Sequence, residues 1–489
     1  MNAALLIIGF FFLAALVLGV LARAGRDMNL EQWTVGGRGL GSVFVFLLLA
    51  GEIYTTFTFL GGSSWAYGKG GPALFIIAYG TLAYVMSYWL LPPIWRYAKA
   101  HGLVSQSDFF AAKYSSPYLG VLVGVVGIVA MIPYLVLQFK GLKLIVETTS
   151  YGAISGSAAV WIGAGVITLY VMASGLRGSA WTAALKDLMI LGVVVFLGIY
   201  LPLHYHGGFE QMFGAIDHAK PGFLKLPAHG NSPVWFASTV CLTMLGFYMW
   251  PHTFGSAYSA RNERVFRKNA IWLPLYQLVL LFVFFVGFAA IGEIPHLANN
   301  DLALLQISLQ TFPPWVLGLI GAAGLLAALV PGAMLMMATA TLAARNIYQA
   351  LRKSTTDDQV ASLAKWLVPA VALVAIYFTF AGGKGIVALL LMAYSFVTQL
   401  FPSLLLSLFP NHIGTKQGAA AGIVAGMGAV AWLTLAPAHA GRIATLFPPA
   451  LHDLNPGIAA LILNVVVLLA VSLATRAVRK RALRQSLAG

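Results

Sequence analysis

Charged residues are scarce in this chain of 489 residues. Asp, Glu, Lys and Arg together make up 9% of it, whereas ordinary soluble domains contain about 25%. Hydrophobic residues make up 60%. A chain this long and this poor in charge has too little polar surface for water, so the composition predicts an integral membrane protein that contacts the lipid bilayer.

Cysteine and the motifs of catalysis are also lacking. The single Cys241 lies in an apolar run and has no second cysteine to pair with, which excludes a disulfide framework. No nucleophile elbow or zinc motif occurs. We therefore expect no enzyme, no cofactor and no metal site, because the histidines of the longest polar loop lack metal-site spacing: His204, His206, His218 and His229.

Long apolar runs are what the chain has in abundance. A bilayer-spanning helix needs about 20 apolar residues. The longest gap between such runs, 204–232, has the length of a loop and not of a soluble domain. We predict thirteen spans, near 4–22, 41–68, 73–97, 117–149, 157–174, 182–203, 233–256, 270–292, 314–344, 365–382, 385–409, 418–437 and 457–475.

The basic residues indicate topology. The formal charge is +15, but most basic side chains fall in alternate loops and in the C-terminal tail. By the positive-inside rule, thirteen spans then place the C-terminus in the cytoplasm and the N-terminus outside. This distribution explains the charge without a nucleic-acid partner. The first span has no basic segment before it, so we predict a retained helix and not a signal peptide.

The second predicted span is unusually polar. It carries Glu52 near its middle, with Gly51 before it and Gly61 and Gly62 after it. Backbone that leaves helical geometry at membrane depth must line a cavity or be buried in protein. We interpret 41–68 as a discontinuous helix of the kind that forms transporter sites; the alternative is a buried helix in which small residues allow close packing. The hydroxyl side chains of this stretch are Thr55, Thr56 and Thr58.

Later spans add further polar positions. Lys186 and Asp187 lie within the span 182–203, where charged residues usually mark ion pathways; the alternative is snorkelling to the interface, which is easier for Lys186. We expect these two neighbours to point to different helix faces, each toward its own inward partner. Gln138 is a weaker candidate on the span 117–149.

A second helix break is predicted at Pro251, which removes a backbone donor from the span 233–256. Tyr248, Trp250 and His252 surround it and are candidate site residues. A lone histidine can equally be a hydrogen-bonded interior residue. The proline and the neighbouring rings favour a functional role.

The positions of the two breaks indicate an inverted repeat. Each break begins a set of five spans, and an odd number of spans gives the two sets opposite orientations, with the site at mid-membrane between the breaks. The predicted segments are an N-terminal helix and loop (1–38), a first repeat (39–205), an external loop (206–232), a second repeat (233–410), and two final helices with a basic tail (411–489).

Four motifs carry a resemblance to a known family: FLGGSSWAYGKG, SDFFAAKY, GLRGSAWT and RNIYQALRK. In this order they resemble the sodium/solute symporter family, from about residue 4 to 480. The resemblance implies an all-α membrane protein with the leucine-transporter type of 5+5 core, in which the first and sixth core helices are broken. GEIYTTFTFLG, WPHTFGSAYSARNERVFRKNA and ALVPGAMLMMATATLAARNIY are similar to the bacterial monocarboxylate permease branch. That likeness implies a transporter of lactate, pyruvate, acetate or alanine-like acids in the bacterial inner membrane.

The chain departs from the family where sodium is bound. The resemblance puts the ion-binding carbonyls near Gly51 and Tyr54, and two adjacent hydroxyl side chains at Val330 and Pro331. Valine and proline have no side-chain oxygen, which a hard cation requires. Ala183 also replaces an aspartate that the family has in this region.

Lys186 stands one turn after Ala183. We hypothesise that its ammonium occupies the place of sodium, near Glu52 and the carbonyls of the broken helix. A lysine in a similar place occurs in proton-coupled amino-acid transporters with this core, so the resemblance favours H⁺ over Na⁺ as the coupling cation. Asp187 is included with these groups as a coupling residue.

A small organic acid is the expected substrate. Free backbone N–H groups at Gly61 to Ser64 are candidates to bind its carboxylate, because half-helix N-termini attract anions. The three threonine hydroxyls are further candidates, and Tyr248, Trp250 and His252 are expected to close the other side. Alternatives are a sodium-coupled carrier of proline, pantothenate or another solute, a sensor module, and a channel. Paired broken helices favour alternating access over a channel.

Overall fold

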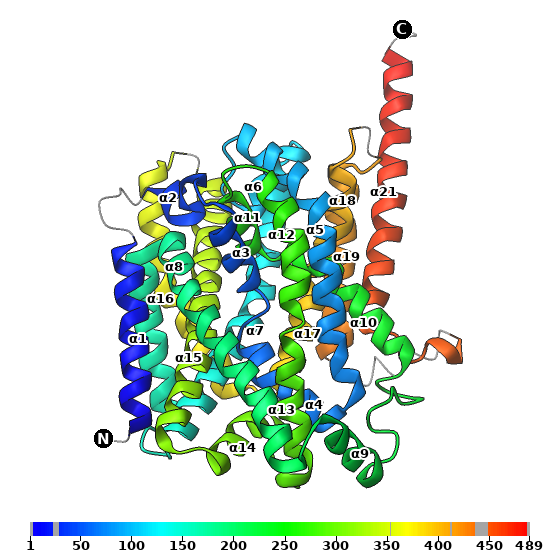
Figure 1. Cartoon of the computed structure of the whole chain (residues 1–489). Helices are drawn as coiled ribbons and strands as arrows, with labels where there is room; N and C mark the ends of the chain where they lie inside the picture. The colour runs from blue at the N-terminus through cyan, green and yellow to red at the C-terminus, as the bar shows by residue number, and fades with distance from the viewer. Residues whose placement is uncertain (1–2, 23–28, 353, 411–412, 436–447, 487–489) are drawn as a thin grey trace.

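The computed structural model describes residues 3–22, 29–352, 354–410, 413–435 and 448–486. Every regular element in these ranges is a helix, so the predicted all-α fold is confirmed. The helices run mostly parallel or antiparallel to one another in a single bundle (Figure 1). Large side chains such as Trp33, Trp250 and Tyr54 are fully buried within it.

The thirteen predicted spans all fall on helical segments, but the number of crossings stays a prediction. Among the described residues, ten helices are long and apolar enough to cross a membrane, or eleven if one bent pair counts as a span. The count of thirteen further requires the segment 41–68 to count as one crossing and the longest helix to count as two. The end of the predicted span 418–437 lies outside the described residues.

The longest helix is α8 (Gly156–His206), with 51 residues. At 1.5 Å per residue it would be about 76 Å long, more than twice the hydrocarbon thickness of about 30 Å. Gly175 divides it, with φ 60° and ψ −164°, a conformation that favours glycine. The predicted spans 157–174 and 182–203 are the two parts of this helix.

The first broken helix consists of α3 (Ser42–Ala50), an irregular turn over 51–55, the π-helical segment η2 (Phe57–Gly62) and α4 (Ser63–Lys69). The break therefore lies at Gly51 and just after it. The expectation that it extends to Gly61 and Gly62 is wrong, because both glycines lie inside a helical segment.

Close packing explains these two glycines. A Cβ atom on Gly61 would lie 2.9 Å from Cγ2 of Val387, and one on Gly62 would lie 3.2 Å from the ring of Phe284. Their role is to let neighbouring helices approach, as small residues do in membrane bundles.

The second break is confirmed at its predicted place. α10 (Pro233–Gly246) continues into the short η4 (Phe247–Met249), Trp250 is extended, and α11 (Pro251–Tyr258) follows. The two helical parts are bent by 54°. Pro251 occupies the first turn of α11, where its missing N–H costs nothing.

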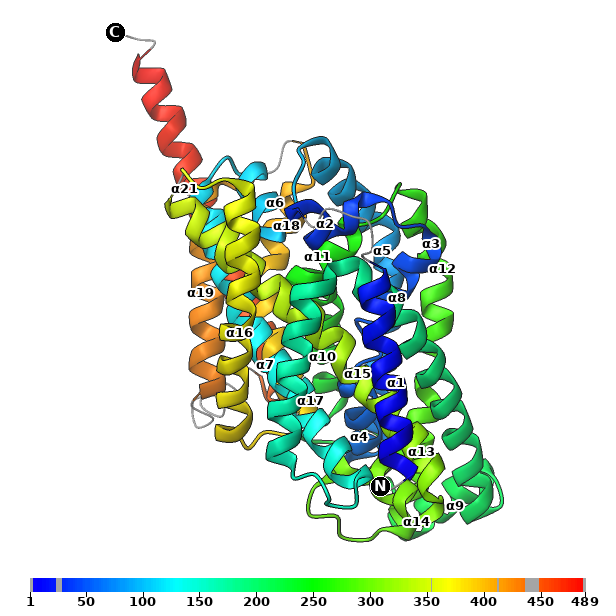
Figure 2. The same cartoon turned by 90° about the vertical axis from the view of Figure 1, so that its left-hand side faces the viewer.

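The two ends of the bundle are distinct (Figures 1 and 2). α2 (Leu30–Val35), α6 (Gln106–Lys113) and α11 lie at one end with the C-terminus, and α4, α9 (Phe209–Ala219) and α14 (Ala303–Thr311) lie at the other with the N-terminus. We call these the α6 end and the α14 end. The remaining main helices are α1 (Ala3–Leu21), α5 (Phe75–Ala100), α7 (Pro117–Thr149), α12 (Arg264–Gln277), α13 (Leu280–Glu293), α15 (Pro314–Thr341), η6 (Leu342–Gln349), α16 (Asp357–Ala381), α17 (Ile386–Val397), η7 (Thr398–Leu400), α18 (Phe401–Ser407), α19 (Lys416–Leu435) and α21 (Pro456–Ser486).

Candidate functional site

Lys186 lies directly against the first break. Its Nζ donates a hydrogen bond to the carbonyl of Tyr54 at 3.1 Å, and a Cβ placed on Gly51 would be 3.1 Å from the same Nζ. The side chain is fully buried. The structure thus brings the ammonium to the two backbone positions that the sequence suggested for an ion.

Lys186 and Asp187 form an ion pair with each other. Nζ lies 2.9 Å from Oδ1 of Asp187, and both side chains are buried. The expectation that the two neighbours need separate partners is wrong. The carboxylate oxygens of Asp187 accept no hydrogen bond among the described residues, so the ammonium is the charge that compensates this buried carboxylate.

Glu52 points away from Lys186 and toward α11. Its carboxylate contacts Nε2 of His252 and accepts a hydrogen bond from Oγ of Ser256 at 3.4 Å. No ion pair joins Glu52 to Lys186 within the described part of the chain, which corrects the expectation that the ammonium lies beside this carboxylate. Glu52 instead connects the first break to α11, just after the second break.

Two of the three threonine hydroxyls bind backbone and not solute. Thr55 Oγ1 accepts from the N–H of Phe57 at 3.1 Å, and Thr58 Oγ1 donates to the carbonyl of Ile53 at 2.7 Å. They satisfy polar groups freed by the break, as buried backbone requires. Of these three threonines, Thr56 is the one whose buried hydroxyl has no partner among the described residues.

The proposed anion site at Gly61 to Ser64 does not form in this structure. Gly61 and Gly62 belong to η2, and the N–H of Ser63 bonds to the carbonyl of Leu60. Ser64 uses its hydroxyl to donate to Oδ1 of Asp301 at 3.0 Å. The irregular backbone lies several residues earlier, beside Lys186.

Aromatic rings surround Glu52 and the second break. Tyr134 donates its hydroxyl to the carbonyl of Glu52 at 3.0 Å, and its ring centroid is 4.9 Å from that of Trp250. Trp250 in turn lies 5.2 Å from the ring of Tyr394. Trp250 and His252 are thus brought to the break as predicted, and Tyr248 is also buried. Tyr134 and Tyr394 were missed, although both lie in polar parts of their spans.

Gln138 and the two α15 positions are buried. Neither amide atom of Gln138 has a partner among the described residues, and a Cβ on Gly332 would lie 4.0 Å from Cβ of Gln138. Val330 and Pro331 immediately precede Gly332 within α15 and are buried as well. They bring no hydroxyl to this part of the core.

Asp301 closes the bundle at the α14 end. Its Oδ2 lies 2.9 Å from Nζ of Lys140 and accepts the N–H of Ile386 at 3.2 Å, while Oδ1 binds Ser64. One buried carboxylate therefore connects α4, α7 and the start of α17. We call this group the Asp301 latch.

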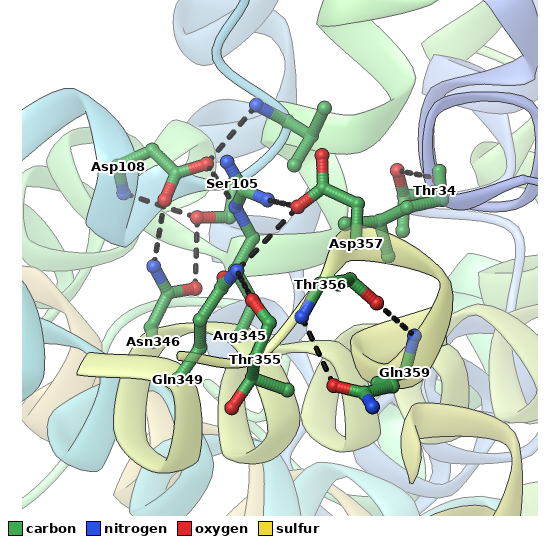
Figure 3. A network of polar contacts seen from close by, with 12 residues as sticks. Thr34, Ser105, Asp108, Arg345, Asn346, Gln349, Thr355, Thr356, Asp357 and Gln359 are labelled. Atoms are coloured by element: carbon green, nitrogen blue, oxygen red, sulfur yellow. Dashed lines mark hydrogen bonds and ion pairs between the residues drawn. The ribbon is translucent and has the colours of Figure 1, made fainter. Parts of the chain in front are cut away.

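A second network closes the α6 end (Figure 3). Asp108 accepts from Nε of Arg345 at 2.9 Å and from Nδ2 of Asn346 at 2.8 Å. Ser105 donates to Oδ1 of Asn346 at 2.9 Å, and Arg345 also lies 3.4 Å from Asp357. The motifs SDFFAAKY and RNIYQALRK are thus direct partners. Networks at both ends enclose the buried centre.

Replacing Asp301 by Asn should loosen the α14 end. Asn keeps the shape but loses the charge, and a hydrogen bond to a charged group contributes about 1 kcal/mol more than a neutral one, so we expect about fivefold faster opening. The measurement is labelling of Val387→Cys by a membrane-impermeant thiol reagent in a Cys241→Ser background. Glu293→Gln, which removes an exposed charge near the same end, is the matched control. Equal labelling of both variants would contradict a latch.

These features define the class of protein. A multi-pass helical bundle with two broken helices in contact at its centre, and polar networks closing both ends, has the construction of a secondary transporter. The chain belongs to the sodium:solute symporter family, whose model matches residues 33–426. It is therefore a membrane symporter and not an enzyme, and the family implies a small solute together with a coupling ion.

Individual relatives agree with this membership. The chain is 63% identical over 488 residues to the uncharacterized symporter YhjB of Bacillus subtilis (strain 168), covering 99% of this chain and 100% of that protein. It is 29% identical over 442 residues to a monocarboxylate transport permease protein of Rhizobium johnstonii, covering 87% and 88% of the two chains.

Solved structures support the fold alone, because their sequences are distant. A Na⁺-coupled sialic acid symporter in a substrate-bound outward-open state matches with a TM-score of 0.80 at 14% identity, covering 95% of this chain and 97% of the other. A nucleobase-cation-symport-1 family transporter in a closed conformation matches with a TM-score of 0.55 at 12% identity, covering 89% and 93%. The leucine-transporter type of fold is confirmed, whereas the inverted repeat stays a prediction.

Proposed function

We propose that this chain is a proton-coupled symporter that takes up a short monocarboxylate such as lactate, pyruvate, acetate or an alanine-like acid. The observation that carries the coupling is the buried Lys186 ammonium, 3.1 Å from the Tyr54 carbonyl. The 29% identity to a monocarboxylate transport permease supports the substrate class. We also propose the bacterial inner membrane, with the α6 end in the cytoplasm and the N-terminus outside, on the positive-inside rule.

Lys186 supplies, in this proposal, the positive charge that a sodium ion supplies elsewhere in the family. A protonated amine holds the carbonyl of Tyr54 and neutralises Asp187. Loss of the proton removes the positive charge, which weakens the bond to Tyr54 and leaves Asp187 without its counter-charge, and the broken segment is then free to rearrange. This links proton binding to the movement of α3 and α4.

Thr56 and Gln138 are the groups that we propose for the substrate carboxylate. Thr56 packs against Gly141 of α7 so closely that a Cβ there would be 1.7 Å from its methyl group. Gln138 lies three residues earlier on α7 and therefore on the same helix face. Both side chains have buried polar atoms without partners in the described part of the chain. A bound carboxylate accepts hydrogen bonds from a hydroxyl and an amide of this kind.

Sodium coupling is the second candidate. The family name favours it, and it fits a carrier of proline, pantothenate or another solute. Against it stand Val330 and Pro331, which provide no side-chain oxygen as cation ligands.

Uptake into proteoliposomes separates these possibilities. Labelled lactate should accumulate when an inward proton gradient is imposed without sodium, and a sodium gradient at equal pH should have no effect. Unlabelled pyruvate, acetate, alanine and proline are added as competitors, and we expect the first three to compete and proline not to. Uptake that requires Na⁺ would replace this proposal by the second candidate, and failure of every monocarboxylate would reject the substrate class.

A further inference from the structure

We propose that His252 is a proton-loading site that exchanges protons with the α6 end through a buried water molecule. The inference rests on the proton coupling proposed above. It adds the group that receives the proton and the side from which water reaches it.

A small cavity lined by both polar and apolar residues lies between His252 and the α6 end. Its volume is about 20 Å³, and a water molecule needs roughly 10–15 Å³ measured in this way, with two to four polar partners. Hydroxyl and amide side chains line it together with apolar ones. The polar lining residues are Thr34, Ser105, Gln106, His252 and Thr341.

Two lining residues carry buried polar atoms without partners among the described residues: Oε1 of Gln106 and Nδ1 of His252. The amide of Gln106 is held in one orientation, because Nε2 donates to the carbonyl of Met249 at 2.6 Å. Oε1 therefore remains as an acceptor. A water molecule that donates to Oε1 and bonds to Nδ1 would satisfy both atoms, and buried polar atoms in native proteins are normally satisfied.

The imidazole then joins this water to the first break. Nε2 of His252 contacts the carboxylate of Glu52. Glu52 is the next residue after Gly51, and Gly51 lies beside the Lys186 ammonium. An imidazole binds a proton at one nitrogen and releases one from the other. The charge on His252 would therefore act directly on the broken segment.

Of the residues around this cavity, His252 is the one proposed to accept the proton, because the other charged groups nearby lie elsewhere or are paired. Among its described lining residues, none apart from His252 carries a titratable side chain, and α15 and η6 contribute only Met337, Ala338, Thr341 and Leu342. Lys186 and Asp187 face the opposite side of the break, and Asp108 and Arg345 pair with each other at the α6 end. The phenols of Tyr84 of α5, Tyr134 of α7, Tyr248 of η4 and Tyr394 of α17 are buried, and a phenol is neutral near pH 7.

Two variants test the route separately. His252→Gln removes the proton acceptor, and Ala338→Val fills the cavity while leaving His252 and Gln106 in place. Pyranine-loaded proteoliposomes report proton entry, labelled lactate reports uptake, and exchange of labelled for unlabelled lactate at equal pH reports transport without net proton movement. We expect Ala338→Val to keep exchange near the wild-type rate. Uptake driven by the pH gradient should fall about tenfold.

His252→Gln should lower proton entry and flatten the pH dependence of uptake. Wild-type protein that shows no proton-driven uptake would defeat the proposed function itself. Proton-coupled wild-type protein together with a proton-coupled His252→Gln variant would overturn only the role of His252. Unchanged proton entry in Ala338→Val would overturn the water route.

Discussion

Lys186→Gln should reduce pH-gradient-driven uptake about a hundredfold or more. The substitution removes the donor to Tyr54 and leaves the carboxylate of Asp187 buried without its cation. Breaking a buried ion pair from one side costs about 3–5 kcal/mol, and the coupling charge is lost with it. Initial uptake rates of labelled lactate under an imposed pH gradient measure the effect, alongside the thermal stability of the purified variant.

Lys186→Gln with Asp187→Asn is the matched control for this prediction. The double variant removes both charges, so no uncompensated carboxylate remains and stability should recover. Uptake driven by the pH gradient should not recover, because the titrating amine is still missing. Restored uptake in the double variant would show that Lys186 serves only to neutralise Asp187.

Gly141→Ala should reduce uptake about tenfold, because overpacking in a dense core typically costs about 1–3 kcal/mol. The added Cβ would lie 1.7 Å from the methyl group of Thr56, and the broken segment must move to avoid it. Initial uptake rates at saturating and low substrate concentrations measure the change.

Thr56→Ser in the Gly141→Ala background removes the clashing methyl group and keeps the hydroxyl. We expect partial recovery of uptake. Gly165→Ala is the control, because a Cβ at Gly165 meets no atom within 4 Å. Equal activity of the Gly141 and Gly165 variants would show that α7 and the break need no close contact.

The fold could be predicted because lipid imposes strong rules on sequence. Runs of apolar residues predicted the helices, and Pro251 together with its neighbouring rings predicted the second break, since a proline removes a backbone donor from a continuous helix. Gly51 and Glu52 indicated the first break for a similar reason: a carboxylate and a glycine at membrane depth are costly in a plain lipid-facing helix. These are local properties, which a single segment reveals without its neighbours.

The partners across the bundle could not be predicted in the same way. Glu52 was expected beside Lys186 but contacts His252, 200 positions away along the chain. Gly61 and Gly62 were expected to belong to the break and to offer free backbone N–H groups, whereas Val387 and Phe284 require their small size. Both outcomes depend on how helices rotate against one another, and a helix face changes with a shift of one or two residues.

The amino-acid sequence by itself determined that this chain is a membrane bundle with two broken helices. Hydrophobicity, proline and residue type act at their own positions, so these features follow from the letters alone. Only the tertiary structure decided that Lys186 pairs with Asp187, that Glu52 joins His252, and that Thr55 and Thr58 bind backbone. A buried polar group takes whichever partner packing brings within about 3 Å, and packing is a property of the whole bundle.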